Sequence, residues 1–227
     1  MLNISGLEVT IQAVTVLREV NLELPTGMMA GLIGRNGAGK TSLMRSIMGL
    51  LPARHGTMDF DGVNLGQVPS HSRTRLGIGY MPEDRRLIPE LTTEENILLP
   101  FWATNGNRSH EGLTRIYHDI PELEAMRERK ALQLSGGQQK LVALGRALMC
   151  GTKLLLLDEP FEGVAPALAQ RIGEVIAALR QQGMSILISE SDLHHSARML
   201  DRVFRIERGE VTQHETSTIA RSHGEQS

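Results

Sequence analysis

The sequence is poor in cysteine, in long apolar runs and in N-terminal targeting signals. Its single cysteine, Cys150, excludes an internal disulfide and fits a reducing compartment such as the cytosol. No stretch approaches the ~18 consecutive apolar residues that a membrane-spanning helix needs. The N-terminus enters an alternating segment at residues 7–11 without a basic region followed by an apolar one, so we expect no signal peptide. A role at a membrane would therefore require a partner.

Excess charge of either sign is also lacking. The formal net charge is −2 and the pI is about 6.5, which gives no general electrostatic attraction to nucleic acid or to an anionic membrane surface. At 227 residues the chain can form one large α/β domain, or one domain with a sizeable insertion, and it can bury a substantial core.

The most informative stretch covers residues 34–41, which match the phosphate-loop spacing G-x-x-x-x-G-K-[ST]. An apolar run of buried-strand length precedes it, and apolar residues at helical spacing follow it, at Leu43, Met44, Ile47, Leu50 and Leu51. Strand, glycine-rich loop and helix together predict a site in which backbone N–H groups and the helix N-terminus hold a phosphate. Lys40 is expected to reach the β- and γ-phosphates, and the Thr41 hydroxyl to bind Mg²⁺.

A second predicted strand ends in two carboxylates. Residues 154–157 are four consecutive leucines, typical of a strand buried on both faces, and Asp158 and Glu159 follow directly. In a protein with a phosphate loop, we expect Asp158 to hold the Mg²⁺ shell and Glu159 to polarise the attacking water.

Residues 135–138, with the sequence Ser-Gly-Gly-Gln, permit two interpretations. Ser135 and Gln138 have the spacing of a capping box, so the stretch can simply begin a well-capped helix. Two adjacent glycines at a helix N-terminus can equally form an anion site with close backbone approach. We refer to residues 135–138 as the Ser135 stretch.

The remaining pattern predicts an α/β fold with a helical insertion. Residues 2–24 predict short strands forming an antiparallel edge beside the phosphate loop, and residues 77–81 a strand returning to the sheet. Residues 86–149 predict the insertion, with a capping box at 92–95 and helices over 104–131. We expect helix interruptions at Gly106, Gly112 and Pro121, and a surface loop over 103–110.

Beyond the two acids, Pro166 predicts the start of a helix that ends at Gly183, and residues 203–211 predict a hairpin. The expected organisation is one domain, with a core at about 1–85 and 150–211, a helical subdomain at about 86–149, and a polar tail over 212–227.

The order of these motifs resembles the nucleotide-binding subunit of ATP-binding cassette (ABC) transporters. The phosphate loop, then Leu134 with the Ser135 stretch, then the four leucines with Asp158, Glu159 and Pro160 carry the resemblance, which covers about residues 2–211. Residues 79–86, 91–92, 95–96 and 163–166 look like the branched-chain amino acid uptake group, whose relatives also carry urea or short amides. The implied fold is a P-loop nucleotide hydrolase core with a mainly parallel sheet, an antiparallel β edge and a helical subdomain insertion.

The resemblance implies a nucleotide site shared between two subunits in a head-to-tail dimer. ATP and Mg²⁺ are the implied cofactors, and the implied nucleotide-binding residues are Ile11, Gly34, Arg35, Asn36, Gly37, Ala38, Gly39, Lys40, Thr41 and Ser42. The second subunit would supply Ser135, Gly136, Gly137 and Gln138. The implied metal ligands are Thr41, Asp158 and Glu83, and the implied catalytic residues are Glu159, Lys40, Glu83 and Ser191.

The implied partners are transmembrane permease subunits, a second ABC ATPase subunit and, indirectly, a solute-binding protein, with no nucleic acid. The protein would then lie peripherally on the cytoplasmic face of the inner (plasma) membrane. Apolar residues between 84 and 102 can form the surface that docks on the permease, or can pack internally; Leu99 and Phe101 are the candidates for an exposed position.

Two departures from the family pattern concern the nucleotide site. Relatives carry an aromatic residue that stacks on adenine, whereas Ile11 occupies that position here and no Phe, Tyr or Trp occurs before Phe60. Ser191 replaces the switch histidine; His194 and His195 follow it and are either substitutes or surface residues.

Two further departures lie in loops. Glu83 stands where the family has glutamine, although the branched-chain group often shows Pro-Glu at that place. Residues 161–165 lack the usual Ser-x-x-x-Asp pattern.

The expected function is an ATP-hydrolysing subunit that energises an importer for branched-chain amino acids or a related small polar solute such as urea or short amides. A nucleotide-gated scaffold with weak hydrolysis is an alternative, because the switch position is serine. A soluble ABC protein acting on DNA or ribosomes is disfavoured by the single cassette and the absence of a basic patch.

Overall fold

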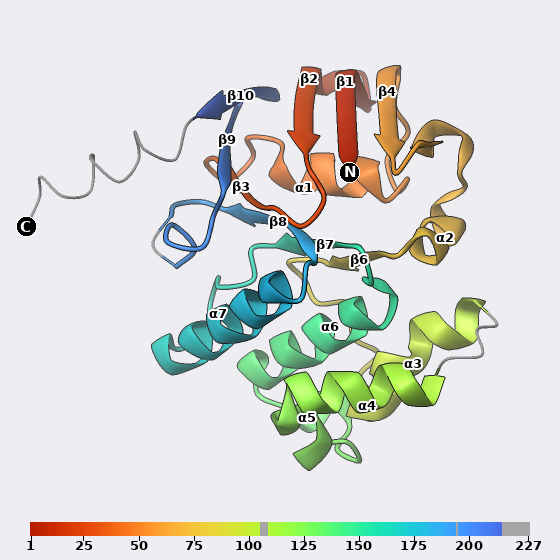
Figure 1. Ribbon diagram of the computed structural model, residues 1–227, viewed down its shortest axis with the longest axis vertical. Coiled ribbons are helices and arrows are strands. Elements are labelled where there is room, and N and C mark those ends of the chain that lie inside the picture. Colours follow the sequence, from red (N-terminus) through yellow and green to blue (C-terminus); the bar gives the residue numbers. More distant parts are fainter. Residues whose placement is uncertain (105–108, 194, 215–227) are drawn as a thin grey trace, which may run out of the picture.

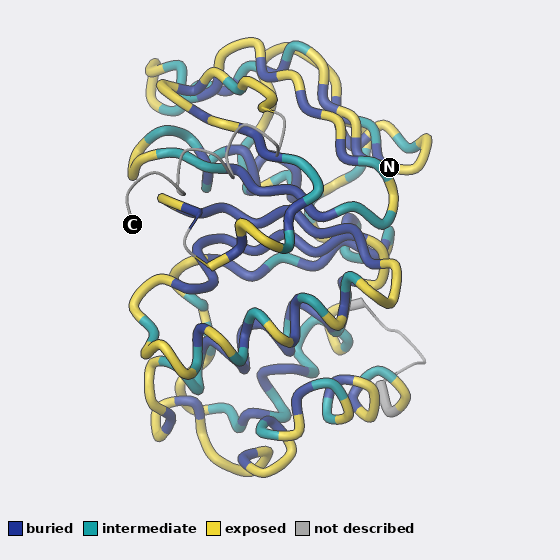
Figure 2. The backbone as a smooth tube through the Cα atoms, turned by 60° about the vertical axis from the view of Figure 1, so that its left-hand side comes forward, coloured by how far each residue is buried: buried dark blue, intermediate teal, exposed yellow. Residues whose placement is uncertain are grey.

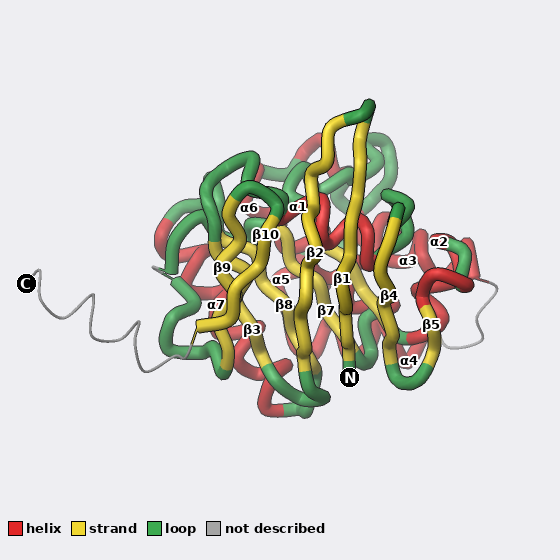
Figure 3. The backbone as a smooth tube through the Cα atoms, turned by 90° about the horizontal axis from the view of Figure 1, so that it is seen from above, coloured by secondary structure: helices red, strands yellow, loops and turns green. Residues whose placement is uncertain are grey.

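Two β-sheets and a set of helices are stacked in layers in the computed structural model, which describes residues 1–104, 109–193 and 195–214 (Figure 1). The first sheet is antiparallel, in the order β2-β1-β4-β5. Its strands are β1 (Leu2–Ile11), β2 (Val14–Leu24), β4 (His55–Phe60) and β5 (Val63–Asn64). Figure 3 shows β1, β2 and β4 running side by side across this face.

The second sheet has the order β10-β9-β3-β8-β7-β6 and is parallel except for the β9–β10 hairpin. Its strands are β3 (Met29–Ile33), β6 (Ile78–Met81), β7 (Leu154–Asp158), β8 (Ser185–Glu190), β9 (Arg202–Glu207) and β10 (Glu210–His214). The predicted fold class is confirmed, since a mainly parallel sheet, an antiparallel sheet and helices are all present.

Helices cover both faces of the second sheet. α1 (Lys40–Ile47) lies between the two sheets, and further α-helices lie on the opposite face of the second sheet (Figure 1). These are α3 (Thr93–Thr104), α4 (Ser109–Asp119), α5 (Pro121–Ala125), α6 (Gly136–Cys150) and α7 (Pro166–Gln181). Short helical turns occupy α2 (Ser70–Arg73), Leu65–Gln67, Thr74–Leu76 and Ala131–Gln133.

The second sheet separates two hydrophobic cores, and strand periodicity assigns side chains to each. Leu155 and Leu157 of β7 belong to the core beneath α6 and α7, whereas Leu154 and Leu156 belong to the core around α1 and the antiparallel sheet. All four leucines are fully buried. The continuous apolar run thus reflects burial on both faces, and the buried central strands are visible in Figure 2.

The antiparallel prediction at the N-terminus is confirmed, but the strand lengths differ from the prediction. Residues 2–24 form two long strands rather than several short ones, within a separate antiparallel sheet. Register shifts along the β1–β2 pair break the alternation of buried and exposed residues, which made the strands look shorter in the sequence.

Three predictions within the helical region and the C-terminus also differ from the structure. Gly112 lies inside α4 and does not interrupt it. A Cβ at this position would come within 3.2 Å of the Met149 side chain, so the glycine allows Met149 of α6 to pack closely against α4. Of the predicted loop 103–110, residues 103–104 and 109–110 are helical, and the others, with Gly106, lie outside the described residues. The predicted tail begins inside β10, and residues 215–227 lie outside the described part.

Candidate functional site

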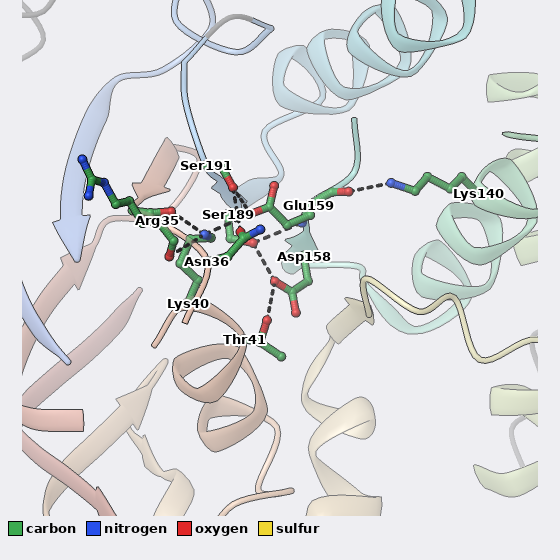
Figure 4. A network of polar contacts seen from close by, with 10 residues as sticks. Arg35, Asn36, Lys40, Thr41, Lys140, Asp158, Glu159, Ser189 and Ser191 are labelled. Carbon is green, nitrogen blue, oxygen red and sulfur yellow. Dashed lines mark hydrogen bonds and ion pairs between the residues drawn. The ribbon is translucent and has the colours of Figure 1, made fainter. Parts of the chain in front are cut away.

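Three neighbouring parallel strands carry the candidate site at their carboxyl ends. β3, β8 and β7 are adjacent in the sheet, and each leads into polar residues: the phosphate loop, Ser189 to Ser191, and Asp158 with Glu159. Because the ends of parallel strands meet at one edge, these residues lie together (Figure 4). The sequence motifs therefore converge although contacting residues such as Asn36 and Ser191 are 155 residues apart in the chain.

The phosphate loop has the backbone that glycine permits. Gly37 and Gly39 have φ angles of 79° and 117°, and Gly39 immediately precedes α1. The Lys40 ammonium turns back over the loop, donating to the carbonyl oxygens of Gly34 and Arg35. It also pairs with Glu159, with Nζ 3.0 Å from Oε1, and both side chains are more than nine-tenths buried. The cation that is expected to bind phosphate is thus held within reach of the predicted base.

Asp158 accepts three hydrogen bonds. The hydroxyls of Ser189 and Thr41 donate to Oδ1 at 2.6 and 3.2 Å, and the Tyr80 hydroxyl donates to Oδ2 at 3.2 Å. Burial raises the pKa of the Asp158 carboxyl above its ordinary value, while the three hydrogen bonds lower it. Thr41 and Asp158, both predicted Mg²⁺ ligands, are therefore in direct contact.

Glu159 has a strained backbone at a φ of 48°, in the left-handed region that non-glycine residues rarely adopt. The Ser191 hydroxyl is 3.1 Å from Glu159 Oε1 and 3.0 Å from Asn36 Oδ1. The structure thus brings the residue at the switch position into contact with the predicted base and with the phosphate loop.

A cavity of about 640 Å³ lies against the phosphate loop. Glu83 and Glu159 line it together with residues of β2 and of the β9–β10 turn. Burial raises the pKa of the Glu83 carboxyl, and the charges of Glu162, Asp158 and Glu159 raise it further. The complete lining is Val14, Thr15, Val16, Arg18, Asn36, Gly37, Gly39, Lys40, Thr41, Ser42, Glu83, Glu159, Arg208 and Gly209.

Ile11 is not among the residues that line this cavity, and its place at the adenine stays a prediction. Ile11 and Val14 pair across a tight turn at Gln12 and Ala13, both of which have positive φ angles. The turn places Val14, which is 63% exposed, on the cavity side, and leaves Ile11 on β1 outside it.

The Ser135 stretch forms the predicted capping box but does not join the cavity. Ser135 accepts from the Gln138 N–H at 3.3 Å, and the Gln138 side chain accepts from the Ser135 N–H at 3.0 Å. None of residues 135–138 lines the cavity. Arg85 donates to the Gly136 carbonyl oxygen at 3.3 Å and to Gln139 at 2.9 Å, so this helix start is tied to the loop that follows β6.

Of the predicted substitutes for a switch histidine, His195 is exposed and stacks obliquely against Phe161, with ring centroids 5.1 Å apart. His194 lies outside the described residues.

Sequence reasoning missed two buried polar residues of the site, Ser189 and Lys140. The Lys140 ammonium donates to the carbonyl oxygens of Glu159 and Glu162, the former at 2.7 Å, and so ties α6 to the loop after β7. The sequence contained a signal for Lys140. This lysine lies four residues before Leu144, and therefore on the same face of the predicted helix as an apolar residue, which indicates a buried lysine with a polar partner. Ser189 gave none, because a serine at a strand end is an ordinary turn residue.

The donor set suits Mg²⁺, which prefers oxygen ligands and takes several from water and phosphate. Among the described residues, no group of three or more His, Cys, Asp or Glu side chains is arranged to hold a metal by itself. Thr41 and Asp158 would supply two oxygen ligands at the phosphate loop, and the remaining ligands would come from nucleotide and water.

A family model for the ABC transporter family matches residues 17–162. Among curated proteins, the chain is 36% identical over 200 residues to the high-affinity branched-chain amino acid transport ATP-binding protein BraG of Pseudomonas aeruginosa, covering 88% of this chain and 86% of BraG. It is 30% identical over 205 residues to the lipopolysaccharide export system ATP-binding protein LptB of Escherichia coli, covering 89% of this chain and 85% of LptB.

Solved structures share the fold. The ADP conformation of MJ1267, an ATP-binding cassette of an ABC transporter, is 26% identical, with a TM-score of 0.84, covering 100% of this chain and 95% of that one. The dimeric structure of MJ0796, a bacterial ABC transporter cassette, is 23% identical, with a TM-score of 0.85, covering 95% of this chain and 99% of that one. Within the described residues, no helix has both the length and the apolarity to cross a membrane. The chain belongs to the ABC transporter family, as an ATP-binding subunit of the class of ATPases coupled to transport.

Proposed function

We propose that this ATPase energises an importer for branched-chain amino acids or a related small polar solute such as urea or short amides. The observation that carries the solute class is the 36% identity to BraG over most of both chains. LptB is less similar, at 30% identity, and its substrate is a lipopolysaccharide.

The proposed chemistry assigns each polar group at the edge of the sheet a role. Lys40 and the amides of residues 34–42 hold the phosphates of ATP, and Thr41 and Asp158 hold Mg²⁺, with Glu83 facing the same cavity. Mg²⁺, when bound, neutralises charge on the phosphates. Glu159 orients and deprotonates the attacking water, and its carboxylate pairs with the Lys40 ammonium.

The Ser135 stretch supports a dimer in which each site is completed by a second subunit. Its backbone groups lie at the N-terminus of α6, Ser135 and Gly136 are exposed, and it contributes nothing to the cavity of its own chain. We assign Ser135, Gly136, Gly137 and Gln138 to the γ-phosphate bound by the partner subunit, in a homodimer or a paired-subunit dimer.

The proposed permease contact lies on the helical subdomain, which we expect to begin at about residue 86. Leu99 and Phe101 are half-buried, which corrects the expectation that one of them is exposed. Ile88 and Trp102 are 41% and 49% exposed and are the better candidates for the contact. This assignment places the protein on the cytoplasmic face of the membrane, with a solute-binding protein acting on the far side.

The alternative, a nucleotide-gated scaffold with weak hydrolysis, draws support from Ser191, which offers a neutral hydroxyl where an imidazole is usual. Phosphate release by the purified protein with Mg²⁺ and ATP distinguishes the two. Sustained turnover that disappears in Lys40→Ala supports the motor, whereas ATP binding without turnover supports the scaffold.

The solute class is tested in the source organism. Deleting the coding region should abolish high-affinity uptake of radiolabelled leucine, isoleucine or valine, and the parent gene should restore it while Lys40→Ala does not. Loss of urea or short-amide uptake alone would move the assignment to that solute. Intact uptake of all these solutes with defective lipopolysaccharide export would overturn the importer proposal.

A further inference from the structure

Two serines at the end of β8 face the two acids at the end of β7. Ser189 lies in β8, and Ser191 directly follows Glu190, the last residue of that strand. Asp158 is the register partner of Ser189 in the parallel pair. Ser191 contacts Glu159 at the surface, whereas Ser189 lies beneath it with no exposed area (Figure 4).

The Ser189 hydroxyl uses both its donor and its acceptor on the neighbouring strand. It donates to Asp158 Oδ1 at 2.6 Å, and it accepts from the backbone N–H of Glu159 at 3.1 Å. One side chain therefore touches the carboxylate of the first acid and the strained backbone of the second. The 2.6 Å bond is the shortest of the three that Asp158 accepts.

These contacts fix the orientation of the Asp158 carboxylate. Ser189 and Thr41 hold Oδ1 from two sides and Tyr80 holds Oδ2, so the carboxyl group is fixed against rotation about its own axis. Unlike Thr41, which shares Oδ1 with it, Ser189 has no expected contact with nucleotide or metal. Its effect on Asp158 can therefore be separated from direct ligand binding.

We propose that Ser189 is a positioning residue that holds the Asp158 carboxylate in the orientation that binds the metal of the metal–nucleotide complex. The inference rests on the proposed Mg²⁺ site at Thr41 and Asp158. Ser189 acts through Asp158 and does not touch the reacting atoms.

The Ser189→Ala variant is expected to fold. The Glu159 N–H that loses the hydroxyl keeps a second acceptor, because the Ser189 carbonyl oxygen lies 3.2 Å from the same nitrogen. The same strand offers a matched control in Ser185, which is 5% exposed and accepts one backbone hydrogen bond, from the Gly27 N–H at 2.9 Å. Ser185→Ala removes a buried hydroxyl from β8 that is not bonded to either acid.

The test measures the affinity of the full chain for the non-hydrolysable analogue AMP-PNP, once with Mg²⁺ and once with EDTA. The dissociation constant in EDTA divided by the dissociation constant with Mg²⁺ reports how much the metal contributes to the affinity. Ser189→Ala should reduce this ratio about tenfold, the scale of one hydrogen bond to a charged group, while leaving the affinity in EDTA unchanged. Ser185→Ala should leave the ratio unchanged, with a similar change in melting temperature.

An unchanged ratio in Ser189→Ala would overturn the inference, as would an equal reduction in Ser185→Ala. If the parent protein itself binds AMP-PNP equally with Mg²⁺ and with EDTA, the proposed Mg²⁺ site is wrong and the inference falls with it. A metal-dependent parent with an unaffected Ser189→Ala variant contradicts the role of Ser189 alone.

Discussion

The edge of the sheet at Asp158 and the Ser135 stretch are both made of polar residues, but the hydrogen-bonding groups of the two regions find their partners in different ways. At the sheet edge, Lys40, Asp158 and Glu159 are buried and hold one another or hydroxyls supplied by other strands. In the Ser135 stretch, Ser135 and Gln138 bond each other's backbone, and Ser135 and Gly136 are exposed.

The difference supports the proposal that the sheet edge is complete within one chain and that the Ser135 stretch acts on the nucleotide of a second subunit. A buried network of charges is stable only when its groups are paired, so the sheet edge is preorganised before nucleotide arrives. An exposed helix N-terminus has unpaired N–H groups directed at solvent, which suits an anion brought by another subunit. Changes at the sheet edge should therefore affect chemistry, and changes at the Ser135 stretch should affect assembly.

The largest expected effect is that of Glu159→Gln. Loss of a positioned general base should reduce phosphate release at least ~100-fold, because base catalysis contributes about that much. ATP should remain bound and should hold two subunits together, which light scattering would detect as a dimer. Glu162→Gln, at an exposed acid three residues on, is the control and should hydrolyse ATP normally. A monomer at high concentration with nucleotide demonstrably bound would contradict the shared site.

The second prediction concerns the other region. Ser135→Arg should abolish the ATP-dependent dimer and reduce turnover at least about tenfold, while ATP binding by the monomer stays unchanged because residue 135 is outside the cavity. Thr92→Arg is the matched control, since Thr92 also forms a capping box, accepting from Glu95 N–H at 3.1 Å, and each loss of a cap costs about 1 kcal/mol. Equal loss of the dimer in both variants would mean that helix destabilisation, and not the interface, explains the effect.

Patterns confined to one element could be predicted from the sequence. The leucines of β7 and the capping boxes at Thr92 and Ser135 obey local rules of burial and hydrogen bonding, so both were predicted correctly. Gly112 was predicted wrongly, because the packing of Met149 against α4 is a contact between distant segments.

The site could be predicted in its motifs but not in its connections. The Ser189 hydroxyl donates to the carboxylate of Asp158 on another strand, and only the pairing of β7 with β8 brings these two residues together. Ile11 was placed at the adenine by counting back from the residues of β2, and that count could not show that the turn at Gln12 and Ala13 puts Val14 among the cavity-lining residues. Sequence spacing fixes distance along the chain, whereas the direction of a side chain depends on the turn.

The third prediction concerns Glu190, a buried acid at the sheet edge, and the pH dependence of the free energy of unfolding. Burial raises the pKa of Glu190 from 4.5 to about 7, with the charges of Glu159 and Asp192 adding to it and the Ser196 hydroxyl opposing it. The folded state then binds this proton more tightly than the unfolded state, so stability is lost as pH rises from about 4.5 to about 7. Glu190→Gln should raise the free energy of unfolding by about 3 kcal/mol at about pH 8 and far less at about pH 5.

Urea denaturation at the two pH values measures this difference. Glu210→Gln, at an exposed acid on β10, should show no such dependence. A Glu190→Gln variant whose gain is the same at both pH values would show that Glu190 is ionised throughout and that the buried edge tolerates its charge.

The fourth prediction concerns Ser191, the solvent-facing member of the serine pair. A hydroxyl cannot donate the charged hydrogen bond that an imidazolium can, and such bonds contribute about 1.5–3 kcal/mol. Ser191→His should raise phosphate release about tenfold at saturating ATP, the equivalent of 1.4 kcal/mol. If Ser191→His leaves turnover unchanged while Glu159→Gln abolishes it, this position does not limit hydrolysis and its assignment as the switch is wrong.

The smallest expected effect is at the adenine end of the cavity, where no aromatic side chain is among the lining residues. Stacking on a base contributes roughly 1–3 kcal/mol in nucleic-acid binders, so most of the affinity here should come from the phosphates and the metal, and ATP should be weakly preferred over GTP. Val14→Tyr should tighten ATP binding several-fold, measured by titration calorimetry, without changing competition by free phosphate. Ile11→Tyr places the same ring on the other side of the turn and should have a smaller effect, since Ile11 is outside the cavity. A larger gain from Ile11→Tyr would show that the β1–β2 turn moves when nucleotide binds and restores the position expected from the sequence.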